Sequence, residues 1–334
     1  MATSGAATTS RRLAADQLAA ASGETGQPFD KTCEVQLVSG HMPTTISQSF
    51  SILKSNLEVT GLQQSTVSTR QNSVRSVMEA GMTVKDSFLS GSYSRSTMIA
   101  PLAEADIDIF TVLDPRYFHF YDGKNGGPSG LLDFVKRTLR RTYTKTPDIS
   151  RSGQAVTIRF TDFAVDVVPG FVREGGGYLI PDSVRGQWLS TDPKKHVEIF
   201  AAANRTHNGN LVPVIKMLKA WNKNNRNFFR SFHVEVLALE TFTGITISDF
   251  PSGVRFFFDK ARNLVTQKNL DPAGYGDDIG RYLNTREKIN EAGVTLQLAY
   301  ERAVAAEGQE QRGLTRSAIE SWSKLFGDYF PAYG

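Results

Sequence analysis

The sequence contains a single cysteine, Cys33, among its 334 residues. One thiol cannot form an internal disulfide, and no group of Cys and His has the spacing of a zinc site, so a disulfide scaffold and a zinc fold are excluded. No apolar run approaches the ~18 residues of a membrane-spanning helix, and the first residues lack the apolar segment of a secretion signal. These absences predict a cytoplasmic protein that does not enter a membrane.

A strong excess of one charge is also missing. Lys and Arg number 38, and Asp and Glu number 34, which gives a net charge of +4. Such a small surplus permits binding of polyphosphates or nucleic acid but does not by itself indicate it. The contents of 40% hydrophobic and 22% charged residues are those of a globular protein. At about 150 residues per domain, the length predicts two domains.

The patterning of the chain divides it into four parts. Residues 1–40 are rich in Ala, Ser, Thr and Gly and predict a flexible N-terminal tail. Residues 41–190 begin with helical spacing and continue with alternating strand patterns, whereas residues 191–326 show helical patterns alone. Residues 327–334 are expected to form a mobile C-terminal tail. The predicted fold class is therefore α+β, a mixed sheet with flanking helices followed by a helical lobe.

Within these parts, individual elements can be predicted. The expected strands cover residues 84–90, 105–113, 155–160 and 163–168. The expected helices cover residues 46–59, 67–78, 93–99, 131–143, 194–206, 211–224, 231–243, 281–306 and 314–326. The strings GGGYLIPD (175–182) and QWLSTDP (187–193) are expected to form the hinge between the sheet and the helical part.

Three aspartates stand in strand patterns. Asp106 and Asp108 are two residues apart, so their carboxylates project from the same face of a strand. Carboxylates held side by side repel each other, and a divalent cation relieves the repulsion. With Asp166 on a neighbouring strand, they could bind two metal ions about 3.5–4 Å apart and align a phosphoryl transfer. A pair of aspartates with this spacing is common, however, and most such pairs are solvated strand edges.

A glycine and a serine upstream strengthen the metal interpretation. Gly91 and Ser92 follow a predicted strand and open the helix expected over residues 93–99. Glycine allows the backbone to approach a phosphate closely, and the N–H groups of such a turn can bind it. The turn alone is weak evidence of a site. Followed by the aspartate pair and then by a single strand aspartate, it is a strong one.

These strings resemble a known superfamily. SGSYSRST, ADIDIF and AVDVVP are similar to segments of the DNA polymerase β-like nucleotidyltransferases, and the closer resemblance is to the CD-NTases, bacterial enzymes related to cyclic GMP-AMP synthase and oligoadenylate synthase. WLSTDPKKH, LVPVIKMLKAWNK, RSFHVEVLALE and NLDPAGYGDDIG resemble the same group. The resemblance covers about residues 45–300. It implies a polymerase β-like core with a C-terminal helical lobe, a bilobal enzyme.

The resemblance implies a role for each site residue. Gly91 and Ser92 would bind the donor triphosphate, and Asp106, Asp108 and Asp166 would hold two Mg²⁺ or Mn²⁺ ions.

The resemblance also extends to four residues of the helical part. Lys216 and Lys219 would reach the triphosphate, Ser231 would touch it, and Phe232 would stack on a base. The two lysines are three residues apart and can share one helix face, although a solvated face is nearly as good an interpretation. Phe232 could equally belong to the core.

The function that the resemblance implies is synthesis of a cyclic di- or trinucleotide from nucleoside triphosphates, ATP among them, in anti-phage signalling. A downstream effector would bind the product. Accessory regulatory proteins, or proteins that conjugate the C-terminus at Gly334, are compatible with it. The Cys/His insertion with which animal cyclic GMP-AMP synthase holds DNA is missing, and activation by nucleic acid is left open.

Two alternatives remain at this point. The first is a linear oligonucleotide or RNA nucleotidyltransferase, whose primer could lie on the basic stretch 136–145; a solvated helix face explains that stretch at least as well. Its basic residues in adjoining helical positions are Lys136, Arg137, Arg140 and Arg141. The second alternative is a catalytically silent module that binds nucleotides or nucleic acid. The histidines lack metal-ligand spacing and receive no catalytic role.

Overall fold

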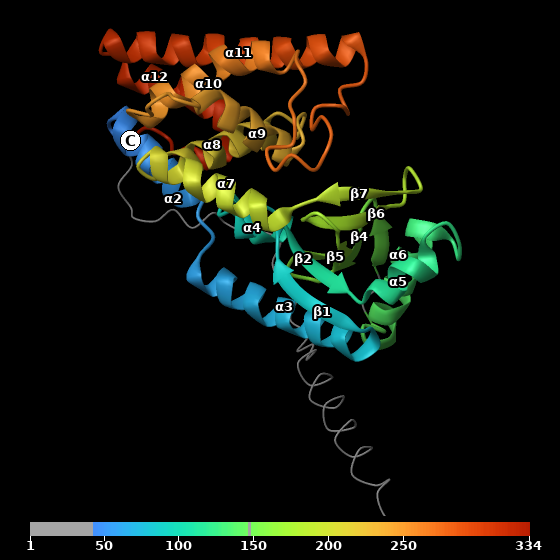
Figure 1. Ribbon diagram of the computed structural model, residues 1–334. Helices are drawn as coiled ribbons and strands as arrows, with labels where there is room; N and C mark the ends of the chain where they lie inside the picture. The colour runs from blue at the N-terminus through green and yellow to red at the C-terminus, as the bar shows by residue number, and fades with distance from the viewer. Residues whose placement is uncertain (1–42, 146–147) are drawn as a thin grey trace, which may run out of the picture. The chain divides into compact units, whose positions relative to one another are not determined.

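The computed structural model describes residues 43–145 and 148–334 of the chain (Figure 1). The tail expected over residues 1–40, with Cys33, lies outside them. The described residues form a mixed sheet with flanking helices and then a helical region, which confirms the predicted α+β class. No helix within these two stretches is long and apolar enough to cross a membrane.

The sheet comprises seven strands in the described part of the chain. They are β1 (Val84–Leu89), β2 (Asp106–Leu113), β3 (Ile149–Ser152), β4 (Ala155–Arg159), β5 (Ala164–Val172), β6 (Tyr178–Asp182) and β7 (Gln187–Thr191). Their order is β1-β2-β5-β4-β3, and β6 and β7 continue from β5. Strands β2 and β5 are parallel, whereas β1 pairs with β2, and β4 with β5, in the antiparallel sense. The sheet is therefore mixed, as predicted.

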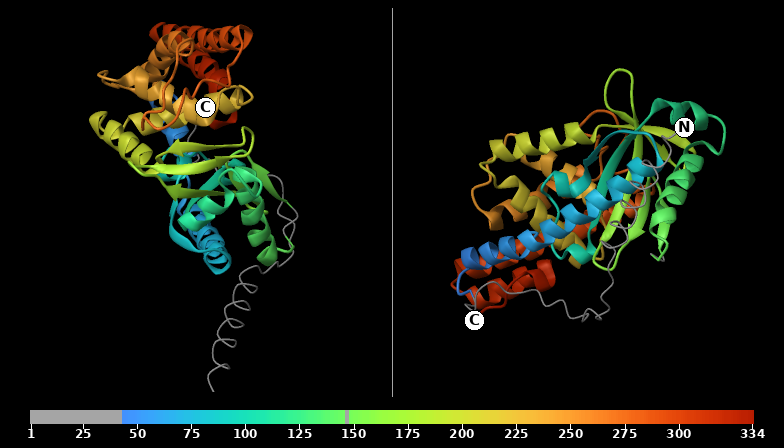
Figure 2. Two further views of the ribbon diagram at one scale, coloured as in Figure 1. Left: turned by 45° about the vertical axis from the view of Figure 1, so that its right-hand side comes forward. Right: turned by 90° about the horizontal axis from the view of Figure 1, so that it is seen from below.

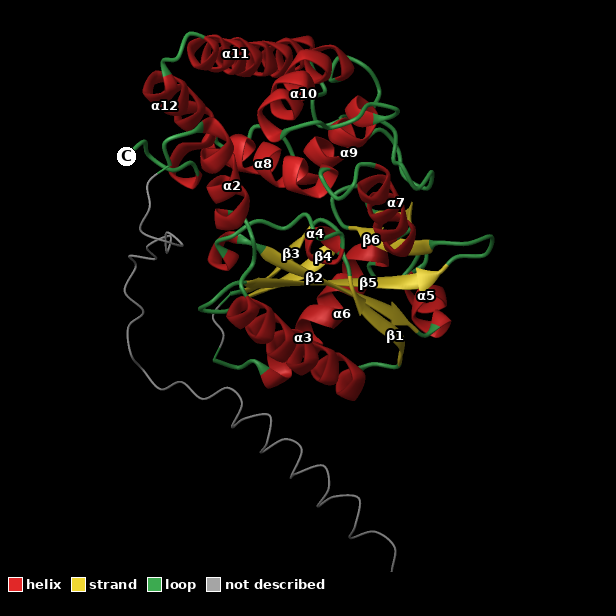
Figure 3. Ribbon diagram, turned by 90° about the vertical axis from the view of Figure 1, so that its left-hand side faces the viewer, coloured by secondary structure: helices red, strands yellow, loops and turns green. Residues whose placement is uncertain are grey.

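One face of the sheet is covered by two helices, α3 (Gly61–Gly81) and α6 (Gly127–Thr142), with the short α5 (Pro115–Tyr121) preceding α6. The alternation in β2 directs Ile107 and Ile109 into the core that these helices share with the sheet. Figure 3 shows α3 and α6 on the same side of the strands. The even-numbered residues of β2 therefore point to the opposite face of the sheet.

The helical region follows β7. Its helices are α7 (Pro193–Thr206), α8 (Leu211–Asn224), α9 (Ser231–Phe242), α10 (Phe250–Leu264), α11 (Arg286–Gln311) and α12 (Thr315–Phe326). Five of these six were predicted, and α8 has the predicted limits. Helix α10 was not predicted, although its N-terminus carries a start signal, because Asp249 caps the N–H of Ser252 and proline follows in the first turn. Figure 2 shows α8–α12 gathered at the end of the molecule away from α3.

The helical region has a core of its own, which also contains α2 (Ile46–Asn56). The ring of Phe50 packs edge-on against the rings of Trp322, Phe326 and Phe330. The C-terminal segment 327–334, expected to be a mobile tail, instead contributes to this core, because Phe330 is buried there. The division into a catalytic part over residues 41–190 and a helical part over 191–326 stays a prediction.

Two local expectations were wrong. The helix expected over residues 93–99 is a single turn, α4 (Gly91–Ser94), and the chain leaves it at Arg95 before Ser96 takes a positive φ of 61°. The segments 175–182 and 187–193, expected to be a hinge, contain the antiparallel hairpin β6–β7 instead. Short strands of mixed polarity carry little periodicity, so tertiary pairing decided their structure.

Candidate active site

The three predicted aspartates lie on two adjacent strands. Strands β2 and β5 pair in parallel with Asp108 opposite Asp166, and Asp106 lies one step along the same face of β2. This face is opposite the one from which Ile107 and Ile109 enter the core beneath α3 and α6. The structure therefore brings Asp106, Asp108 and Asp166 to one face of the sheet, as the alternation in β2 indicated.

The carboxylates of this site disfavour one another's negative charge. Burial, followed by the charge of Asp166, raises the pKa of Asp108 to about 7. Burial also raises the pKa of Asp166, and the charge of Asp106 adds to the effect. Moreover, Asp166 Oδ1 is buried without a hydrogen-bond partner among the described residues. Buried oxygens in this condition are costly unless a cation or a donor approaches them.

The glycine–serine loop, residues 90–97, lies directly against Asp108. The N–H of Ser90 donates to the carbonyl of Asp108 at 2.9 Å. Gly91 has a φ of +66°, and a Cβ at this position would come within 1.7 Å of Asp108 Oδ2. Only glycine fits here, for reasons of both backbone conformation and space. The backbone of the loop can thus approach whatever the carboxylates bind, and triphosphate binding by Gly91 and Ser92 stays a prediction.

The donor set fits a divalent cation. Within the described stretches, no group of three or more His, Cys, Asp or Glu side chains converges to form a ready metal cage. Mg²⁺, however, is typically bound by one or two protein carboxylates together with phosphates and water. The unpartnered Asp166 Oδ1 and the mutual repulsion of the carboxylates are compatible with a site that a cation and a triphosphate complete.

The two lysines predicted to reach the triphosphate have protein partners. Lys216 Nζ lies 2.6 Å from Glu58 Oε2. Lys219 Nζ donates to the carbonyl of Thr97 at 2.9 Å and to Glu235 Oε1 at 3.1 Å. Thr97 belongs to the glycine–serine loop, so Lys219 lies beside this loop. Lys216 is held by the chain that precedes α3.

Ser231 and Phe232 begin helix α9. Ser231 is exposed, whereas Phe232 is half-buried against the helical core. The Phe232 ring lies under the guanidinium of Arg95, 4.8 Å from the ring centroid, and edge-on to the ring of His196. In this arrangement Phe232 supports Arg95, and its stacking on a base stays a prediction.

Two residues near the site were missed by sequence reasoning. Arg95 Nε binds Glu235 Oε2 at 2.8 Å, and its positive charge acts against the raised pKa of Asp108. Glu235 is fully buried in α9. A signal existed for Glu235, because it interrupts the apolar run FHVEVLALE, and a charge in a buried helix needs a partner.

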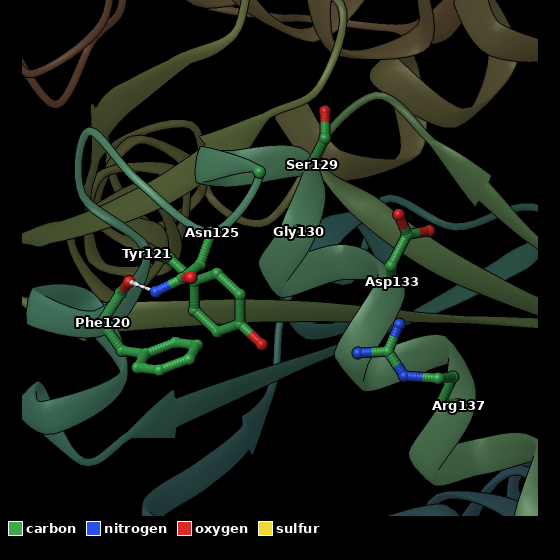
Figure 4. A pocket seen from close by; sticks show the side chains of 8 residues that line it. Phe120, Tyr121, Asn125, Ser129, Gly130, Asp133 and Arg137 are labelled. Carbon is green, nitrogen blue, oxygen red and sulfur yellow. Dashed lines mark hydrogen bonds between the residues drawn. The ribbon is translucent and has the colours of Figure 1, made fainter.

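A surface hollow of about 380 Å³ lies elsewhere (Figure 4). Its lining comes from α5, α6 and the turn between them, including Asn125, Ser129 and Arg137. None of its lining residues comes from β2 or β5, which carry the aspartates. The hollow therefore does not belong to the carboxylate site.

Comparisons with known proteins agree with this geometry. Residues 44–204 match the family described as Second Messenger Oligonucleotide or Dinucleotide Synthetase domain. A probable cyclic nucleotide synthase of Bacillus cereus (strain VD146) is 26% identical over 274 residues, which are 73% of this chain and 81% of that protein. A cyclic AMP-AMP-AMP synthase of Acinetobacter sp. (strain ATCC 27244 / 9458) is 30% identical over 192 residues, 54% of this chain and 53% of that protein.

A similar fold occurs among solved structures. The structure of Escherichia coli MS115-1 CdnC with ATP superposes with a TM-score of 0.67 at 18% identity, over 86% of this chain and 99% of that one. CdnC has also been solved in a complex with HORMA-deltaN. The domain match, the two relatives and the shared fold bear out the resemblance of the sequence motifs. Residues 44–204 thus carry the synthetase domain of this family, and the chain as a whole resembles the CD-NTases in its motifs and its fold.

Proposed function

We propose that this chain joins nucleoside triphosphates into a cyclic di- or trinucleotide, with release of pyrophosphate, at Asp106, Asp108 and Asp166. The observation that carries the proposal is the pairing of Asp108 with Asp166 on adjacent parallel strands, with Gly91 packed against Asp108. This arrangement places acidic oxygens and a closely approaching backbone together, as transfer of a nucleotidyl group requires.

Each residue of the site has a distinct task in this reaction. Asp106, Asp108 and Asp166 would hold two Mg²⁺ or Mn²⁺ ions, which when bound supply the positive charge that the phosphates need. The N–H groups of the loop at Gly91 and Ser92 orient the triphosphate. Asp166 Oδ1, buried and unpartnered among the described residues, accepts the proton of the attacking ribose hydroxyl. The hydroxyl oxygen then bonds to the α-phosphorus as the bond to pyrophosphate breaks.

ATP is the substrate that we expect first. A relative is a cyclic AMP-AMP-AMP synthase, and CdnC has been solved with ATP, which supports an adenine nucleotide here. The test is incubation with each α-labelled nucleoside triphosphate, alone and in mixtures, with Mg²⁺ or Mn²⁺, followed by phosphatase treatment and separation. A phosphatase-resistant product that an Asp106→Ala/Asp108→Ala variant does not make is the expected result. Ladders of phosphatase-sensitive products would indicate a linear transferase instead.

The basic stretch gives little support to a primer-bound transferase. Arg137, Arg140 and Arg141 are exposed on α6. The buried side of α6 packs on the sheet face that carries Ile107 and Ile109, whereas the aspartates project from the opposite face. A primer lying on these arginines would therefore not lead directly to the carboxylates.

We also propose cytoplasmic signalling partners. The complex of CdnC with HORMA-deltaN supports an accessory protein for this chain, and the match to a second-messenger synthetase domain supports a downstream effector that binds the product. The first test is product formation with and without the proteins encoded beside this chain. Full activity of the isolated chain would remove the need for an activating partner.

A further inference from the structure

Glu235 is a carboxylate shut away from water between two cations. It lies in the middle of α9 with no exposed surface. Its Oε2 is 2.8 Å from Arg95 Nε, and its Oε1 is 3.1 Å from Lys219 Nζ. The side chains of Arg95 and Lys219 are themselves only 8% and 7% exposed. Although burial alone would raise it, the charges of Arg95 and Lys219 lower the pKa of Glu235, so the carboxylate stays ionised.

Both cations connect Glu235 to the glycine–serine loop. The backbone N–H of Arg95 donates to the carbonyl of Gly91 at 3.3 Å. Lys219 Nζ donates to the carbonyl of Thr97, and the N–H of Thr97 donates in turn to the carbonyl of Ser92 at 2.9 Å. Glu235 is thus connected by two separate routes to Gly91 and Ser92 of the loop.

Two aromatic rings also fix the orientation of the Arg95 guanidinium. It lies 4.8 Å from the centroid of Phe232 and 5.5 Å from that of Phe200, both of which belong to the helical region. Such contacts favour one orientation of a planar cation and keep water from it. The helical region therefore holds the loop through a desolvated network.

Stability alone does not account for this network. A buried ion pair contributes no more than well-packed apolar residues of similar volume, because the loss of hydration offsets the attraction. What charged partners with fixed geometry can supply is a defined position for the groups that they join, which an apolar contact leaves adjustable. Here the groups joined are α8, α9 and the loop that lies against the carboxylate site.

We propose that Glu235 is a positioning residue, which sets the glycine–serine loop for triphosphate binding through Arg95 and Lys219 without touching the substrate. The inference rests on the proposed function, since it assigns the loop to the triphosphate. According to this proposal, the helical region contributes to the site by fixing the position of the glycine–serine loop. The proposal also assigns Lys219 a role beyond the phosphate contact that the family resemblance implies, because two of its three N–H donors already bind Glu235 and Thr97.

The test compares two glutamates of the same helix. Glu235→Gln keeps the shape but removes the charge, whereas the control Glu240→Gln changes an exposed residue of the same helix that accepts a hydrogen bond from Asn269 and has no connection to the loop. Binding of an ATP analogue with a methylene group in place of the α,β-bridging oxygen is titrated with Mg²⁺, and product formation gives KM and kcat. We expect the Glu235→Gln protein to bind the analogue about 10- to 100-fold more weakly, with KM raised in parallel, and the control to bind it as the wild type does.

A second variant guards against loss of folding, because removing Glu235 leaves two buried cations together. Glu235→Asp keeps the charge but shortens the side chain, so it should fold and bind the analogue several-fold more weakly. Wild-type affinity in either folded variant overturns the proposal, as does an equal loss in Glu240→Gln at an equal melting temperature.

The same measurements separate the two proposals. A wild-type protein that binds the analogue in a Glu235-dependent way but makes no cyclic product contradicts the proposed function alone. A wild-type protein that makes the product while a folded Glu235→Gln variant binds normally contradicts the positioning role alone.

Discussion

Two pairs of acids, one at the carboxylate site of the sheet and one in the helical region, differ in the partners that the protein provides. On the sheet, Asp108 and Asp166 face each other across β2 and β5, and burial raises the pKa of both. In the helical region, Glu235 lies between two cations, and Asp271 accepts hydrogen bonds from His196 and from backbone N–H groups; the pKa of each is lowered. An acid held by cations or by several hydrogen-bond donors stabilises the fold, whereas neighbouring acids that repel each other favour external positive charge.

The largest effect should come from removing a carboxylate of the sheet. Asp108→Asn should reduce cyclic product formation by about 10³-fold or more, because the charge that would bind the cation is lost. Its melting temperature should not fall, since the substitution also relieves repulsion from Asp166. Asp133→Asn, which breaks the surface ion pair between Asp133 of α6 and Arg151 of β3, serves as the control and should keep its activity. A strongly destabilised Asp108→Asn protein would contradict the claim that Asp108, unlike the acids of the helical region, does not stabilise the fold.

The next largest effect is expected in the helical core, on stability alone. Phe330→Ala should lower the free energy of unfolding by about 3 kcal/mol, because the ring is buried against Phe50 and Phe326. Val184→Ala, at a side chain that is 83% exposed, should change it by less than about 0.5 kcal/mol. Denaturant unfolding measures both variants. Equal values for the two would mean that the C-terminal segment does not contribute to the core.

Gly91 allows the contact between the loop and Asp108 to be tested. Gly91→Ala should reduce activity by about 10²-fold, because the new Cβ collides with the Asp108 carboxylate. Gly153→Ala is a matched control, since Gly153 also has a positive φ, +59°, but has open space around it. Both should lose some stability from backbone strain, and Gly91→Ala should lose more because of the collision. Similar activity in the two variants would show that close approach to Asp108 is unimportant.

The smallest effects are opposite responses to pH. Asp271 has a pKa of about 2 in the folded protein, so it stabilises the fold above pH 4, and this contribution of about 1–2 kcal/mol is lost as the pH falls toward 2. Asp108 has a pKa of about 7, so folding keeps a proton that the unfolded chain has released, and stability falls as the pH rises from 4 to 7. The free energy of unfolding is measured across pH for both variants. Asp271→Asn should lack the loss of stability below pH 4, and Asp108→Asn should lack the loss between pH 4 and pH 7. If the two variants showed the same dependence of stability on pH, the opposite roles of Asp271 and Asp108 would be contradicted.

Much of the site could be read from local spacing. Asp106 and Asp108 alternate with Ile107 and Ile109, and period-two alternation assigns the two aspartates to one face whatever the strand pairs with. Five of the six helices described from residue 193 onward were likewise predicted from helical spacing of their apolar residues, whereas α10 was missed. By contrast, the helix expected over residues 93–99 and the hinge expected before residue 193 were wrong, since short segments take their structure from tertiary contacts.

The sequence alone determined the fold class, the resemblance to the CD-NTases and the strand positions of the three aspartates, because these follow from motifs and from alternation within each strand. Only the tertiary structure decided that Asp166 pairs with Asp108, that Gly91 lies against its carboxylate, and that Glu235 joins Arg95 to Lys219. These contacts connect residues far apart in the chain. Whether a buried charge finds a partner there depends on how the elements pack, which no local pattern records.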